Sequence, residues 1–97
     1  MVYSLTEKLE FAENPQIQIK DKKITVKAEA ETALKLMDML DKEGELQASI
    51  KAPELLFSDK DRKIISSLKL SMKDYSTLLS TAMSLCIGED PDKESGE

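Results

Sequence analysis

The stretch that decides the expected fold is QIQIKDKKITVK, which spans residues 16–27. Apolar and polar residues alternate on each side of a charged centre, and this period of two is that of a β-strand with one buried face. Two such runs around a short polar break predict an antiparallel hairpin whose apolar side chains share one face. The apolar residues of the two runs are Ile17, Ile19, Ile24 and Val26.

The turn of this hairpin is expected at Asp21-Lys22, where a two-residue loop would give the pairs Ile19–Ile24 and Ile17–Val26. The turn lacks the Asn-Gly or Asp-Gly sequence that two-residue loops favour, so a longer loop is an open alternative. An isolated hairpin is only marginally stable in water. We therefore expect the helices that follow to cover its apolar face.

Residues 28–43 (AEAETALKLMDMLDKE) are predicted to form the first of these helices. At about 100° per residue, Leu36 and Met39 widen its apolar stripe to roughly 220° of the circumference. A helix that packs on one side needs a narrower stripe, so part of this face is expected to stay free. Gly44 suits the left-handed position just beyond a helix end. The centre of the stripe consists of Ala30, Ala33, Leu34, Met37 and Leu40.

Two further helices are predicted at residues 58–69 and 71–87. Each begins with the Ser-x-x-Asp pattern of a helix N-cap, and the second ends at Gly88 before Pro91, which blocks continuation. The capping pairs are Ser58 with Asp61 and Ser71 with Asp74. The inward-facing residues are expected to be Ile64, Ile65 and Leu68 in the first helix, and Tyr75, Leu78, Leu79, Ala82, Met83 and Cys86 in the second.

The remaining segments have weaker patterns. Residues 1–14 fit either a helix that begins with a capping box at Ser4-Leu5-Thr6-Glu7 or a strand. Residues 45–57 are expected to be a loop in which Pro53 opens a short turn. Residues 88–97 are acidic and nearly free of apolar groups, which is typical of a flexible tail. The expected fold is therefore α+β: a single domain, residues 1–87, in which an N-terminal β-hairpin packs on about three α-helices.

The composition excludes most catalytic chemistry. The chain has 97 residues, no histidine and one cysteine, Cys86. Without histidine there is no His-containing triad and no His metal site, and one cysteine forms neither an intrachain disulfide nor a Cys-based zinc site. Cys86 lies on the apolar face near the end of its helix, where a thiol is expected to be buried and unreactive. We expect a non-enzymatic protein without cofactor or metal.

The charge pattern also excludes classes of partner. The net charge is −5, but residues 88–97 hold five acidic residues against one lysine, which leaves 13 basic and 14 acidic residues in the remainder. This nearly neutral remainder has no basic surface for nucleic acid. No apolar run approaches the ~20 residues of a membrane span, and no secretory pattern is present. A cytoplasmic protein that binds neither nucleic acid nor membrane is expected.

The remaining candidate for function is an apolar surface. Methionine is adaptable and is common on surfaces that bind variable partners. The predicted partner-binding residues are Leu36, Met37, Met39 and Leu40 of the first helix, with Met72 at the start of the last one. The alternative is that the first helix is central and is buried on two sides.

The order of these segments resembles that of the small tail assembly chaperones of long-tailed bacteriophages and prophages of Gram-positive bacteria. The likeness covers about residues 5–91 and includes the phrases FAENP (11–15), LLFSDKDRK (55–63), SLKLSMKDY (67–75) and GEDP (88–91). It implies a non-enzymatic protein that transiently binds the helical tape measure protein and keeps it soluble during tail morphogenesis in the bacterial cytoplasm. The tail tube protein is a second candidate partner, and homo-oligomer formation is open. In this family, a ribosomal frameshift often produces a longer form.

Two other functions compete with this expectation. A small acidic phage protein could regulate or inhibit a host protein, but that role favours acidic residues over the whole folded surface. A minor structural protein of the tail would instead assemble stably and stay in the particle.

Overall fold

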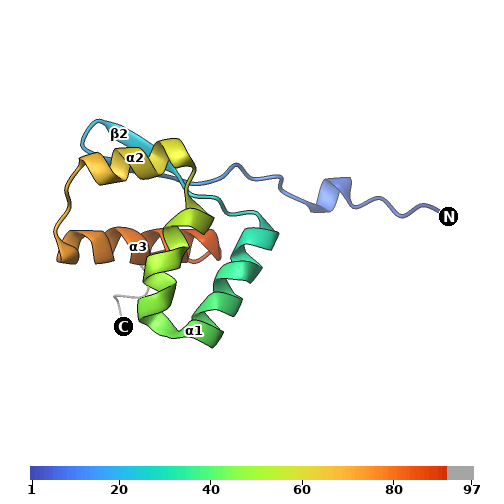
Figure 1. Ribbon diagram of the computed structural model, residues 1–97. Coiled ribbons are helices and arrows are strands. Elements are labelled where there is room, and N and C mark those ends of the chain that lie inside the picture. Colours follow the sequence, from blue (N-terminus) through green and yellow to red (C-terminus); the bar gives the residue numbers. More distant parts are fainter. Residues whose placement is uncertain (92–97) are drawn as a thin grey trace.

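The computed structural model describes residues 1–91, and in this range an antiparallel hairpin is followed by three helices (Figure 1). The expected α+β fold with an N-terminal hairpin is confirmed. The acidic tail predicted at 88–97 lies outside the described residues except for 88–91. The elements are β1 (Gln16–Ile19), β2 (Lys22–Thr25), α1 (Ala30–Leu56), α2 (Asp59–Ser67) and α3 (Met72–Cys86).

The hairpin has a different register from the predicted one. Ile17 lies opposite Ile24 and Ile19 opposite Lys22, so the turn is at Lys20-Asp21 and not at Asp21-Lys22. The predicted pairs are therefore wrong. The change moves the register by two residues, and side chains alternate with a period of two, so the same apolar residues still share one face. Ile24 and Val26 are fully buried, and Ile17 and Ile19 pack against the core.

Pro15 and Lys20 explain the observed register. The Val26 N–H donates to the Pro15 carbonyl at 2.9 Å, but Pro15 has no N–H with which to donate in return. The strand pairing therefore ends at this point. At the other end, Lys20 adopts a φ of +55°, and a positive φ at the first central residue is what the turns favoured in tight hairpins require.

The helix α1 is longer than predicted and consists of two segments. Residues 30–43 and 45–56 meet at Gly44, where φ is 83° and ψ is 174°. Figure 1 shows the two segments side by side, joined by a sharp turn at one end. The helix break predicted at Gly44 is present and φ is positive there, but ψ of 174° is not the predicted left-handed conformation. The loop predicted at 45–57 is wrong because residues 45–56 are helical.

Pro53 is the reason that the loop prediction failed. A proline inside a helix removes one backbone hydrogen bond, but Pro53 lies close to the end of its segment. Ala48, Ala52 and Leu56 are spaced four residues apart and are fully buried, and packing of such a face supplies most of the stability of a helix in a protein. The Phe57 N–H donates to the Pro53 carbonyl at 3.0 Å and closes the last turn.

The ends of α2 and α3 agree with the prediction. The Ser58 hydroxyl oxygen accepts a hydrogen bond from the Asp61 N–H, and the Ser71 hydroxyl accepts one from the Asp74 N–H, each at 3.2 Å. Gly88 has a φ of +86° just beyond α3. Its N–H donates to the Leu85 carbonyl at 3.2 Å, and the Glu89 N–H donates to the Ser84 carbonyl at 2.8 Å. This pair of bonds is a Schellman motif.

The core joins the hairpin to both segments of α1 and to α3. Two bonds tie the hairpin to the helices: the Thr25 N–H donates to Asp61 Oδ2 at 2.9 Å, and the Lys27 N–H donates to the Leu56 carbonyl at 2.8 Å. The core is formed by Ile24, Val26, Leu36, Ala52, Leu56, Phe57, Ile65, Leu78, Leu79, Ala82 and Cys86.

Residues 1–13, called the arm below, lie outside this core. All of them are exposed, and the only regular element is a short 3-10 helix at Thr6–Lys8. Leu5 occupies the N-cap position without a side-chain hydrogen bond, so the capping box does not form. Neither the helix nor the strand predicted for residues 1–14 is present. Figure 1 shows the arm leading away from the rest of the molecule.

The conformation of Gly44 gives a first prediction. At its φ and ψ a side chain is strained, and no atom lies within 4 Å of the position that a Cβ would take. Gly44→Ala is therefore expected to lower the free energy of unfolding by about 1–3 kcal/mol through backbone strain alone. Urea denaturation followed by circular dichroism measures this loss.

A matched control is Gly88→Asn. Asparagine tolerates the left-handed conformation of a Schellman glycine. When asparagine is placed at each of the two glycines in turn, Gly88→Asn should therefore lose less stability than Gly44→Asn. Equal losses would contradict the assignment of strain to Gly44.

Candidate partner-binding surface

The structure separates the residues of the predicted partner-binding surface. Leu36 has an exposed fraction of 0% and belongs to the core, so its expected place on a free surface is wrong. Leu40 is half-buried and packs against the core, and Met39 is half-buried. Only Met37, exposed at 52%, and Met72, exposed at 74%, are open to solvent. These five residues do not form one continuous patch.

The burial of Leu36 follows from the turn at Gly44. Residues 45–56 fold back beside residues 30–43 (Figure 1). Leu36 and Leu40 pack into the core, as expected if the first helix is central. The predicted centre of the apolar stripe is wrong in part, because Leu34 and Met37 are exposed at 64% and 52%.

This burial gives a second prediction. Leu36→Ala should destabilise the fold by about 2–5 kcal/mol, because it leaves a cavity in the core. Met37→Ala, one residue later on an exposed side, should change stability by less than about 0.5 kcal/mol. Thermal denaturation of the two variants compares them. Similar melting temperatures would contradict the central position of Leu36.

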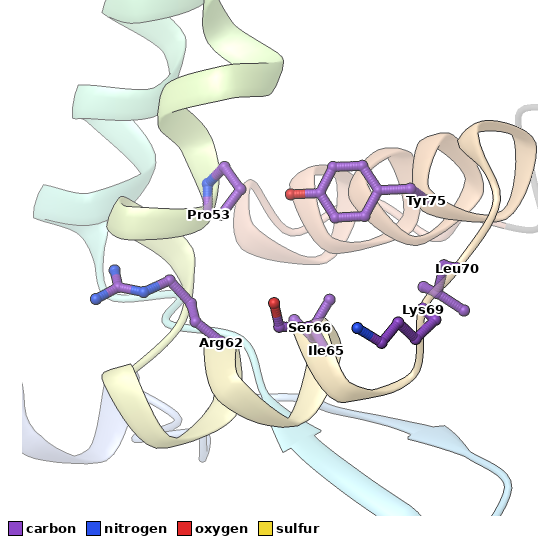
Figure 2. A pocket seen from close by; sticks show the side chains of 7 residues that line it. All are labelled: Pro53, Arg62, Ile65, Ser66, Lys69, Leu70 and Tyr75. Atoms are coloured by element: carbon purple, nitrogen blue, oxygen red, sulfur yellow. The ribbon is translucent and has the colours of Figure 1, made fainter.

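A hollow of about 270 Å³ lies between the second segment of α1, α2 and α3. Figure 2 shows the Tyr75 ring extending from α3 towards Pro53, with Ile65 and Ser66 on the opposite side. The Arg62 guanidinium lies on the far side from Tyr75 and pairs with the Asp59 carboxylate. The lining residues are Pro53, Arg62, Ile65, Ser66, Lys69, Leu70 and Tyr75.

A second hollow of about 460 Å³ follows along α3. Its apolar residues come from both helices, and serine hydroxyls alternate with them. Leu46 is the most open of these, with an exposed fraction of 70%. The lining residues are Glu45, Leu46, Ser49, Ser76, Leu79, Ser80 and Met83.

The two hollows are neighbours, and we call them together the α1–α3 groove. Leu46, Ser49 and Pro53 form one row along α1 at spacings of three and four residues, so they lie on one side of the helix. On α3, Tyr75 lines the first hollow and the adjacent Ser76 lines the second. The two hollows therefore follow each other along both helices.

The α1–α3 groove is suited to binding and not to catalysis. Its apolar residues can cover the apolar side of an amphipathic helix, and its serine hydroxyls can satisfy polar groups at the edge. Met83 adds an adaptable side chain. In residues 1–91 no three Cys, Asp or Glu side chains are grouped to hold a metal ion, and no helix has the length and apolar content to cross a membrane.

Cys86 lies in the core, as predicted. Burial raises the pKa of its thiol, and the negative charge of Glu29 contributes in the same direction. Because the thiolate is the reactive form, both effects suppress reaction. The expected burial of Cys86 is confirmed, and burial is the main cause of the raised pKa.

Thiol labelling tests this directly. Iodoacetamide at pH 8 should modify Cys86 at least tenfold more slowly in the folded protein than in denaturant. Raising the pH should accelerate the reaction of the folded protein only at pH values above the pKa of an ordinary thiol. Equal rates in both states would contradict its burial.

The α1–α3 groove does not follow from the predicted elements, because residues 45–57 are expected to be a loop and are a helix over 45–56. The signal was present: Leu46 and Ser49 lie on one side of a helix and Ala48, Ala52 and Leu56 on another. Tyr75, Leu79 and Met83 were found, but as core residues. Leu79 is indeed buried, whereas Tyr75 and Met83 are half-buried and line the groove.

Comparisons with known proteins gave no match: no family model, no curated protein and no solved structure is similar to this chain.

Proposed function

We propose that this protein is a non-enzymatic tail assembly chaperone of a long-tailed bacteriophage or prophage, which transiently binds helical segments of the tape measure protein and keeps them soluble. The observation that carries the proposal is the α1–α3 groove, two neighbouring hollows beside α1 and α3 that are lined by apolar residues and serines. The order of the sequence segments supports the same family. The role belongs in the cytoplasm of the bacterial host.

The shape of the groove suits a helical partner. An amphipathic helix presents apolar residues at spacings of three and four, and it lays this face into an apolar groove between helices. Leu46 of α1 and the half-buried Met83 of α3 line the second hollow from its two helices, where a bound helix can contact both. A tape measure protein exposes long helices of this kind before the tail tube forms around it, so it offers many such segments.

The chemistry of the groove favours release as well as binding. A small interface with flexible side chains gives modest affinity, since ordering those side chains costs free energy. The groove also differs in charge along its length, with Glu45 in the second hollow and Lys69 in the first. This difference would favour one direction of a charged helix over the other.

Co-expression tests the proposal. A tape measure protein from the same genome should become several-fold more soluble when the two proteins are produced together, and it should co-purify. Leu46→Asp should abolish this gain, because it places a charge in the apolar part of the groove. The soluble fraction on a gel and the complex on size exclusion chromatography are the readouts.

Leu34→Asp is the matched control. Leu34 is exposed on the first segment of α1 and does not line the groove. This variant should support solubility as the natural protein does. If the natural protein leaves the solubility of the tape measure protein unchanged, the chaperone function is overturned. If Leu46→Asp and Leu34→Asp lose the gain in solubility equally, the groove is overturned as its site. Stable retention of the protein in finished particles would favour a structural role.

A further inference from the structure

A second groove lies on the other side of α3, next to the hairpin. It has a volume of about 340 Å³. We call it the β1–α3 groove. At about 100° per residue, the side of α3 that carries Thr77, Leu78 and Thr81 is turned by roughly 130° from the side that carries Ser76 and Ser80 of the α1–α3 groove. The lining residues are Ile17, Ile19, Lys20, Leu70, Asp74, Thr77, Leu78 and Thr81.

The β1–α3 groove lies beside a free strand edge. The sheet contains only β1 and β2 in the described chain, so the other edge of β1 is unpaired there. The edge of β2 is partly occupied, because the Thr25 N–H donates to Asp61 of α2. An unpaired edge presents backbone N–H and C=O groups that can bind another extended chain. A strand added to β1 would place its inward side chains over the groove.

The arm has the pattern that such a strand needs. In an extended chain, odd-numbered residues share one face, and the odd positions of the arm carry most of its large apolar side chains. Phe11 is exposed at 73%, so these side chains find no cover within the described residues. The short 3-10 helix at Thr6–Lys8 would unwind on docking. The exposed apolar residues on this face are Tyr3, Leu5, Leu9 and Phe11.

The charges of the arm and the hairpin are complementary. Residues 1–13 contain three glutamates and one lysine, whereas residues 16–27 contain four lysines and one aspartate. The groove lining itself is balanced, with one lysine, Lys20, and one acid, Asp74, so the excess of positive charge lies on the hairpin beside it. Opposite charges of this kind attract over roughly 10 Å at ordinary ionic strength and favour docking of the arm on the hairpin.

Two hydrogen bonds of Asn14 fix the direction in which the arm leaves the domain, and this direction favours docking on a second copy. The Asn14 side chain accepts from the Ala28 N–H at 3.2 Å and donates to the Glu29 carboxylate at 3.0 Å. This anchor holds the chain where β1 begins, and Figure 1 shows the arm running outward from there. To reach its own β1 edge, the arm would have to reverse direction between Phe11 and Asn14.

We propose that the arm of one copy adds as a strand to the free edge of β1 in a second copy and fills the β1–α3 groove there with its apolar side chains, in a reciprocal exchange that makes a dimer. The two aromatic rings of each arm would together bury about 600–1,000 Å² over the dimer. A stable interface buries about 1,200–2,000 Å², and the leucines and the strand backbone supply the rest. The α1–α3 groove stays open in this dimer.

Sedimentation equilibrium of the full chain tests the exchange. The natural protein should be dimeric at micromolar concentration, and the double variant Leu9→Ser, Phe11→Ser should raise the dissociation constant at least tenfold. The control Leu34→Ser, Met37→Ser removes equally exposed apolar residues from α1 and should leave the constant unchanged. A monomeric natural protein, or a dimer that the arm variant leaves intact, would overturn the proposal.

The groove can be tested separately from the arm. Thr77→Glu adds a negative charge to the β1–α3 groove against an acidic arm, whereas Ser76→Glu, about 100° around the helix, adds it to the α1–α3 groove. Only Thr77→Glu should weaken the dimer. Equal effects of the two variants would contradict this groove as the docking site. Ser76→Glu should instead affect tape measure binding, so failure of the dimer and failure of the chaperone function are distinguishable.

Cross-linking identifies the copy on which the arm docks. A tagged chain with Leu9→Cys and an untagged chain with Thr77→Cys should form a mixed disulfide when oxidised together, since Cys86 is buried in both. Absence of the mixed disulfide, with cross-linking only inside a chain that carries both substitutions, would show that the arm folds back on its own groove and would overturn the exchange.

Discussion

At Gly44 the chain of α1 reverses its direction in a single residue, with φ at 83° and ψ at 174°. This conformation is nearly restricted to glycine, because any Cβ is strained there. The reversal brings residues 45–56 beside residues 30–43 and sets Ala48, Ala52 and Leu56 against the rest of the core. It covers Leu36, and it places Leu46 and Pro53 opposite α3. Both the core and the α1–α3 groove depend on it.

Helix α3 lines both the α1–α3 groove and the β1–α3 groove. Its buried residues, such as Leu78 and Leu79, hold it to the core, and on either side of them its exposed residues line a groove. A small helical domain has little area for binding, since most of its apolar residues are needed for folding. Placing one groove on each side of a single helix would let the proposed self-association and the proposed partner binding use separate residues.

The proposed function and the proposed dimer have different physical bases. The α1–α3 groove combines apolar residues with hydroxyls, which suits a helix that must later dissociate. The β1–α3 groove adjoins an unpaired strand edge and lysines of the hairpin, which suits an extended acidic chain with apolar residues at alternate positions. A dimer would also present two α1–α3 grooves to one long helical partner, and the second contact would then form at a high effective concentration.

The local features of this protein follow from its sequence. The alternation around residues 17–26 specified a hairpin face, and the caps at Ser58 and Ser71 specified two helix starts, because these signals act within a few residues. The register of the hairpin, the helix at 45–56 and the burial of Leu36 depend instead on contacts between distant parts of the chain. In each case a distant contact outweighed a local preference: the pairing of Val26 with Pro15 shifted the turn, and packing of Ala48 and Ala52 kept a helix that contains Pro53. Which apolar residues remain exposed depends on what folds over them, and that is a property of the whole chain.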